Sequence, residues 1–169
     1  MILTRDVILR EIASGRLTVD PFDPAQVGPA SIDLHLGSEI RVMEGGPPVI
    51  DLDDDADYRR FTTLRALDEG YTLRPGETIH GITRERIHLP PDVGGWLEGR
   101  SRFARLGLMI HVTSGFVAPG VDNRQVLEMS NVAGRPMTIR PGIRLCQIVL
   151  QRAEGTAVYA GRFADQQRL

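Results

Sequence analysis

The sequence contains no lysine: all 20 of its basic residues are arginine. A chain without lysine cannot form a Schiff base between a lysine amine and a carbonyl substrate, and it lacks the lysine of a phosphate-binding P-loop. The sequence therefore excludes both enzyme classes. We attribute the missing lysine to codon usage in a GC-rich genome rather than to function.

Cysteine is also nearly absent. Cys146 is the single cysteine, so the chain cannot form an internal disulfide. It stands in the apolar segment Arg144 to Leu150, and free cysteine in such surroundings usually behaves as a small buried side chain. We expect an inert core thiol rather than a nucleophile.

The chain has neither a strong excess of charge nor a long apolar run. Its 20 basic and 22 acidic residues give a net charge of −2, which provides no field for nucleic acid or an anionic membrane. No stretch approaches the roughly 18 apolar residues of a membrane span, and the charged start at Thr4 to Asp6 is unlike a signal peptide. We expect a soluble cytoplasmic protein that binds neither nucleic acid nor membrane.

The length of 169 residues is that of one domain, so we expect a single domain over residues 1–169. Thr4 can cap a short amphipathic helix that ends near Gly15. After it, short apolar or alternating runs are separated by many of the 18 glycines and 11 prolines. Many strands and few helices predict a mainly β fold, a β-barrel or jelly roll with a short N-terminal helix.

The expected strands include Ser31 to Leu36, Glu39 to Met43, Thr78 to Ile82 and Gly95 to Glu98. The clearest expected strand pairing is that of Gln125 to Val132 with the two runs that follow it, Met137 to Ile139 and Leu145 to Leu150. Turn residues at 133–136 and 141–142 separate these three runs, as in consecutive hairpins.

Residues 96–108 hold three arginines and a serine within six positions, beside Gly99. Arginine side chains make bidentate, charge-assisted bonds to phosphate oxygens, and a neighbouring glycine permits close backbone approach. This segment is a candidate phosphate site, although a solvated arginine face is an equally good interpretation of the segment alone.

Glu128 is a single carboxylate between the apolar residues Leu127 and Met129. On a strand it faces the same way as Val126 and Ser130, toward water or a shaped pocket. Partial burial would raise its pKa toward neutrality and suit it to proton transfer, although most strand glutamates are simply exposed.

Together these segments resemble the dCTP deaminases. The resemblance extends over nearly the whole chain and is carried by Pro29 to Gly37, Leu73-x-Pro75-Gly76, Leu89-Pro90, Gly99-Arg100-Ser101-x-x-Ala104-Arg105-Leu106-Gly107, His111-x-Thr113, Pro119-Gly120, Val126-Leu127-Glu128, Asn131 and Arg140-Pro141-Gly142.

The resemblance implies a distorted β-barrel of the dUTPase type, a homotrimer with active sites between subunits, and Mg²⁺ bound with the nucleotide triphosphate. It implies hydrolytic deamination of dCTP to dUTP and ammonia, with Glu128 as general base and acid, Ser101 holding the attacking water, Arg105 ordering the polar network and Arg100 binding phosphate. The implied substrate contacts are Arg100, Ser101, Arg102, Phe103, Ala104, Arg105, Ala118, Val126, Leu127, Glu128, Gln147, Tyr159, Arg162 and Gln166. Residues 159–169 would form a lid.

Composition agrees with chemistry that needs no zinc. Zinc-dependent deaminases need a His-x-Glu motif together with a Cys-x-x-Cys pair or a similar ligand set, which one cysteine cannot supply. The four histidines, His35, His80, His88 and His111, lack ligand spacing, and we interpret each as structural. We therefore expect no protein-bound metal.

Ala118 is the main departure from the family pattern, which has an aspartate there, beside the sugar end of the nucleotide. In related dUTPases and bifunctional deaminases this aspartate helps place the 3′-hydroxyl and the water used for phosphate cleavage. Three hypotheses therefore stay open: a dCTP deaminase, a dUTP-cleaving or bifunctional enzyme, and a silent or altered-specificity nucleotide-binding protein. Loss of the aspartate counts against the second.

Overall fold

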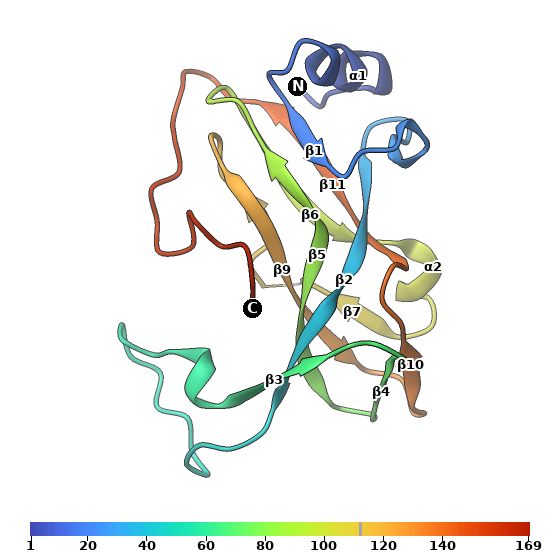
Figure 1. Cartoon of the computed structure of the whole chain (residues 1–169), viewed down its shortest axis with the longest axis vertical. Helices are drawn as coiled ribbons and strands as arrows, with labels where there is room; N and C mark the ends of the chain where they lie inside the picture. The colour runs from blue at the N-terminus through green and yellow to red at the C-terminus, as the bar shows by residue number, and fades with distance from the viewer. Residues whose placement is uncertain (112) are drawn as a thin grey trace.

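The computed structural model describes residues 1–111 and 113–169, and the fold is mainly β, as predicted. One strongly curled sheet forms the body of the molecule, with α1 at one end and the η2 segment at the other (Figure 1). The elements are α1 Arg5–Ala13, β1 Thr18–Asp20, η1 Pro24–Gln26, β2 Ile32–Met43, η2 Tyr58–Arg60, β3 Thr62–Ala66, β4 Tyr71–Leu73, β5 Thr78–His88, β6 Val93–Gly99, α2 Ser101–Ala104, β7 Leu108–Ile110, β8 Phe116–Val117, β9 Asp122–Asn131, β10 Met137–Ile139 and β11 Arg144–Arg152.

The central path of the sheet runs β7-β9-β5-β2-β11-β6-β8, with β1 added to β5 and β3 added to β2. The long strand β2 belongs to both halves: its first residues pair with β11, and its later residues pair with β5 and β3. A strand shared in this way bends the sheet around its own core, which closes much of the edge that a flat sheet would expose.

The core lies inside this curl and consists of the inward residues of the strands. On β2 they are Ile32, Leu34, Leu36 and Ile40, and on β9 they are Leu127 and Met129, all fully buried. Their period of two is the period of strand side chains. Cys146 is fully buried among them, and burial raises the pKa of its thiol, which agrees with the expected inert thiol.

The N-terminal helix was predicted correctly, and Thr4 is its N-cap residue. The Thr4 hydroxyl, however, bonds to the Asp6 carboxylate at 2.5 Å instead of to a backbone N–H.

The expected pairing of β9 with β10 and β11 is wrong. β9 pairs with β5 and β7, β10 pairs with β4, and β11 pairs with β2 and β6. The turns at 133–136 and 141–142 are present, but the curl of the sheet directs each strand to a distant partner. Local turn chemistry locates where a strand ends and not which strand it joins.

Within the described residues, no helix is long and apolar enough to cross a membrane.

Candidate functional site

A cavity of about 460 Å³ lies between β5, β9 and the C-terminal tail. Its volume is within the range of small-molecule sites, about 300–1,000 Å³. Its wall contains both polar and apolar side chains. The lining residues are Tyr58, His80, His111, Ser114, Phe116, Val117, Ala118, Val121, Asn123, Gln125, Val126, Glu128, Tyr159, Phe163 and Gln166.

Glu128 enters this cavity because of its position in β9. The neighbours Leu127 and Met129 point into the core and are fully buried, so the alternation of the strand turns Glu128 to the opposite face. About 36% of its side chain is exposed. The Glu128 side chain thus points into a shaped pocket, one of the two expected environments, rather than into open solvent.

Glu128 is part of a row of polar residues that crosses the sheet. Arg41 on β2 is opposite His80 on β5, and His80 is opposite Glu128 on β9. At the end of β7, the backbone N–H of His111 donates to the carbonyl oxygen of Glu128 at 2.8 Å. We call Arg41, His80, Glu128 and His111 the polar row.

The Nδ1 atom of His111 lies 2.6 Å from Oε2 of Glu128, close enough for a charge-assisted contact. The two atoms are close without being well aligned, since neither has a hydrogen-bond partner of good geometry. His111 is also the one non-glycine residue with a positive φ, 54°, in the described chain. Histidine tolerates this left-handed conformation better than most residues, and here it brings the imidazole beside the carboxylate.

The pKa of Glu128 differs from the expected direction. Burial raises it, but the close contact with His111, the electrostatic effect of that residue and a smaller effect of His80 together outweigh burial, so the pKa of Glu128 lies below its ordinary value. The carboxyl group is therefore ionised near neutral pH and ready to accept a proton. The sequence pattern could not show this effect, because His80 lies on another strand and His111 lies just after β7.

His80 has the opposite balance. Burial is the main influence and lowers the pKa of His80, Glu128 raises it, and Arg41 lowers it further. The net effect keeps the His80 imidazole neutral near pH 7.

The C-terminal tail supplies one wall of the cavity. Tyr159 and Gln166 line it, as the expected lid residues would. Gln166 is joined to β9 by two bonds: its Nε2 donates to the carbonyl oxygen of Arg124, and the N–H of Arg124 donates to its carbonyl oxygen, both at 3.0 Å. Arg162 does not line the cavity, because its guanidinium contacts Asp57 at 3.7 Å instead.

The other expected contacts divide into three groups. Ala118 and Val126 line the cavity. Leu127 is fully buried in the core and does not. Residues 100–105 and Gln147 form no part of the Glu128 cavity within this one chain.

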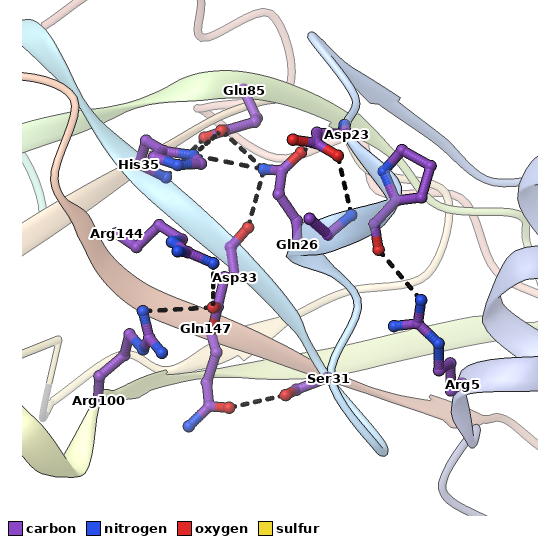
Figure 2. A network of polar contacts seen from close by, with 12 residues as sticks. Arg5, Asp23, Gln26, Ser31, Asp33, His35, Glu85, Arg100, Arg144 and Gln147 are labelled. Carbon is purple, nitrogen blue, oxygen red and sulfur yellow. Dashed lines mark hydrogen bonds and ion pairs between the residues drawn. The ribbon is translucent and has the colours of Figure 1, made fainter.

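Residues 100–105 lie on and beside α2, on the side of the sheet away from the C-terminal tail (Figure 1). Ser101, Arg102 and Arg105 are exposed, and Phe103 is half-buried. Figure 2 shows that Nη1 of Arg100 points to the Asp33 carboxylate, at 3.3 Å, and Arg144 approaches the same carboxylate at 3.8 Å. Gln147 is nearby and accepts a bond from the Ser31 hydroxyl at 2.7 Å.

A buried carboxylate, Glu85, stabilises the segment of β2 that carries Asp33, the partner of Arg100 and Arg144. Glu85 is almost completely buried, and its two oxygens contact Nδ1 of His35 at 2.6 Å, the backbone N–H of His35 at 2.8 Å and Nε2 of Gln26 at 3.0 Å (Figure 2). The same Nε2 donates to the carbonyl oxygen of Asp33 at 3.0 Å. A buried charge needs such partners, and this network holds the β2 segment that carries Asp33.

Several residues of the cavity were not predicted from the sequence. All four histidines were interpreted as structural, yet His80 and His111 lie beside Glu128, and Tyr58, Asn123 and Gln125 also line the wall. Strand pairing was the missing information. In the described part of the chain, no group of three or more histidine, cysteine or acidic side chains is arranged to hold a metal ion.

Comparison with known proteins decides the family. Residues 2–153 match a family model described as dCTP deaminase-like. The chain belongs to this family. A protein of Acidothermus cellulolyticus named "dCTP deaminase, dUMP-forming" is 39% identical, with 98% of this chain and 91% of that protein covered. A protein of Rhodococcus opacus with the same name is 40% identical, with 93% and 84% covered.

A solved structure agrees with this assignment. The 2′-deoxycytidine 5′-triphosphate deaminase of Agrobacterium tumefaciens superposes with a TM-score of 0.71 at 27% identity, covering 90% of this chain. The present chain spans about half of that protein, 48% of its length. The prediction of an enzyme of the dCTP deaminase family with its β fold is thus confirmed.

Proposed function

We propose that this protein hydrolytically deaminates dCTP in the cavity that holds Glu128. The observation that carries the proposal is the ionised, half-buried Glu128 carboxylate in contact with His111, in a chain whose relatives are dCTP deaminases. A positioned base of this kind is what water attack on a ring carbon needs when the protein supplies no metal-bound hydroxide.

In the proposed reaction, Glu128 takes a proton from a water molecule as its oxygen bonds to the ring carbon that carries the amino group. The carboxyl group gives this proton to the ring nitrogen and then carries the second proton, from the new hydroxyl group, to the amino nitrogen, and the carbon–nitrogen bond breaks to release ammonia. His111 would orient the carboxylate and keep it ionised between these steps. Water is consumed, and the amino group is replaced by a carbonyl oxygen.

We propose a homotrimer in which α2 of one subunit completes the cavity of another. Ser101 and Arg105 do not reach Glu128 in the same chain, although the family resemblance assigns them to one site. Two large apolar residues that follow α2 in the chain, Leu106 and Met109, are exposed, and exposed apolar side chains of this kind are typical of a protein interface. Arg100 and Arg105 would then bind the triphosphate.

Magnesium would be bound through the triphosphate oxygens and water. The described residues offer no cluster of carboxylates for an all-protein site, and magnesium in nucleotide sites commonly keeps its waters and binds the phosphates. Mg²⁺ would neutralise phosphate charge when bound.

Two products are in competition, dUTP and dUMP. Ala118 puts a methyl group in the cavity wall where the family pattern has an aspartate, and this favours deamination without phosphate cleavage. The names of the relatives favour dUMP. Incubating the protein with dCTP, dUTP and CTP while measuring ammonia and pyrophosphate separately decides between them: ammonia alone supports dUTP, equal amounts of both support dUMP, and tight binding without either supports a silent binding protein.

A further inference from the structure

The polar row continues past Glu128 to His80, at a place that the proposed proton transfers do not use. Nδ1 of His80 is buried and has no hydrogen-bond partner among the described residues, and the same is true of the Tyr58 hydroxyl. The two rings meet edge to face with their centroids 5.3 Å apart, and both line the cavity.

Two buried polar atoms without partners, side by side in one cavity, call for a ligand or water. A neutral imidazole carries one donor and one acceptor nitrogen, and a phenol can likewise donate and accept. These groups suit a hydroxyl, which also does both, better than a phosphate or a carboxylate. The nearby positive charges do not line the cavity: Arg41 donates to Thr62 at 3.2 Å through Nη1, and both Arg41 and Arg59 lie against the Tyr58 ring.

We propose that His80 and Tyr58 form a second recognition point, which binds a hydroxyl group carried by the pyrimidine ring beside its amino-bearing carbon. The ligand class is a cytosine deoxynucleotide with a hydroxymethyl group on C5. The inference rests on the proposed function, because that function places the amino-bearing carbon at Glu128.

The pairing of β5 with β9 is the reason for assigning His80 to the C5 position of the ring. Directly opposed residues of antiparallel strands have β-carbons about 4.5–5.5 Å apart, so His80 reaches a neighbour of the group on which Glu128 acts. The amino-bearing carbon has two ring neighbours, a nitrogen and C5, and only C5 can carry a substituent in the aromatic base. We therefore place C5, the neighbour that can carry a substituent, on the side of His80, with the amino group facing Glu128.

The test compares deamination of dCTP, 5-methyl-dCTP and 5-hydroxymethyl-dCTP by the parent protein, His80→Leu and Tyr58→Phe. The methyl analogue occupies similar space without the hydroxyl. We expect the parent to favour hydroxymethyl over methyl by at least ~10-fold in kcat/KM, as hydrogen-bonded hydroxyl groups do in enzyme sites. His80→Leu should reduce this ratio at least ~5-fold, since one hydrogen-bond partner of the hydroxyl is lost. His88→Leu, outside the cavity, should leave the ratio unchanged.

A parent that treats both analogues alike would overturn the inference, as would a ratio that His80→Leu and Tyr58→Phe both leave intact. The second result would mean that His80 contacts the ring nitrogen common to all three nucleotides. If the parent deaminates none of them, the proposed function fails, and competition binding of the same three nucleotides then tests the inference separately. Preferential binding of 5-hydroxymethyl-dCTP that His80→Leu removes supports it, and equal binding of all three refutes it.

Discussion

At the scale of single residues, the chemistry of the cavity depends on the ionised state of one carboxyl group. Glu128 is desolvated, which favours its neutral form, and His111 reverses that preference. The ionised carboxylate can accept a proton from water, and His111 stabilises its charged form. Substitutions of these two residues therefore test the proposed reaction directly.

Replacing Glu128 by glutamine should reduce deamination at least ~10²-fold, because the amide keeps the shape of the side chain but cannot exchange protons. Nucleotide affinity should change much less, since the arginines and magnesium would carry most of it. Steady-state ammonia release and nucleotide binding measure the two effects. Glu69→Gln, in an exposed loop, is the control. Parental deamination by Glu128→Gln would rule out the assigned chemistry.

Replacing His111 by asparagine should shift the acid limb of the kcat/KM profile to higher pH. The contact that lowers the pKa of Glu128 is lost while burial, which raises it, remains. The same sign applies to stability: since the folded pKa lies below the unfolded one, the stabilisation by this carboxylate is complete above the unfolded pKa and is lost as pH falls through the folded value. His88→Asn is the matched control, and an unmoved acid limb in His111→Asn would contradict the role of the pair.

At the scale of elements, β6 determines where α2 lies. Gly95 is packed so closely against β11 that a β-carbon there would be 2.4 Å from the carbonyl oxygen of Val149. The two strands pair along their whole length, from Gly99 opposite Cys146 to Val93 opposite Arg152. Helix α2, Ser101–Ala104, follows β6 after one residue. The close packing of β6 against β11 therefore fixes the position of residues 100–105.

Replacing Gly95 by alanine should therefore lower the free energy of unfolding by ~1–3 kcal/mol, the usual range for overpacking. Gly134→Ala is the control, because a β-carbon at Gly134 meets nothing within 4 Å. Denaturant unfolding at fixed protein concentration measures both. Equal stability of the two variants would show that β6 and β11 separate without cost.

Local patterns predicted many elements and few of their partners. Met137–Ile139 was expected with correct bounds, and β2 was expected as two shorter runs, because alternating side chains reveal a strand wherever it lies. The contact between Glu128 and His111 joins β9 to the residue that follows β7, and the row from Arg41 to Glu128 requires the register of three strands. Such information exists only after the sheet has formed. The family resemblance named Glu128 without revealing what surrounds it.

At the scale of the whole molecule, the two halves of the proposed shared site face apart. The Glu128 cavity is on the side of the C-terminal tail, and the α2 arginines are on the other side. Assembly into a symmetric ring of subunits would bring unlike halves together in a head-to-tail interface.

Mixing two inactive variants tests this arrangement. Glu128→Gln and Arg105→Ala damage opposite halves, so co-refolded mixtures should regain activity. In an equal, random mixture about one quarter of the head-to-tail interfaces would join two intact halves, which sets the expected recovery near a quarter of the parental rate. Each variant refolded alone is the control. No recovery, with sedimentation showing an active monomer of the parent, would refute the shared site.

Metal removal tests whether the proposed reaction depends on zinc or on magnesium. Zinc chelators should leave deamination intact, because the described residues offer no zinc cluster, whereas removal of magnesium should weaken triphosphate binding. Metal analysis together with nucleotide titration measures both effects. Stoichiometric zinc whose loss abolishes activity would overturn the mechanism.

The strand order also has a consequence for synthesis on the ribosome. β5 and β9, which form the floor of the cavity, can meet once residue 131 has left the exit tunnel, and β2, the other partner of β5, emerges before both. β6 finds its long partner only when β11, the last strand, emerges at residues 144–152. During translation the strand floor of the Glu128 cavity can therefore form before the arginine half is held in place, whereas the wall from the C-terminal tail is added last. A nascent chain that stalls before residue 144 would leave the edge of β6 that pairs with β11 exposed and open to aggregation.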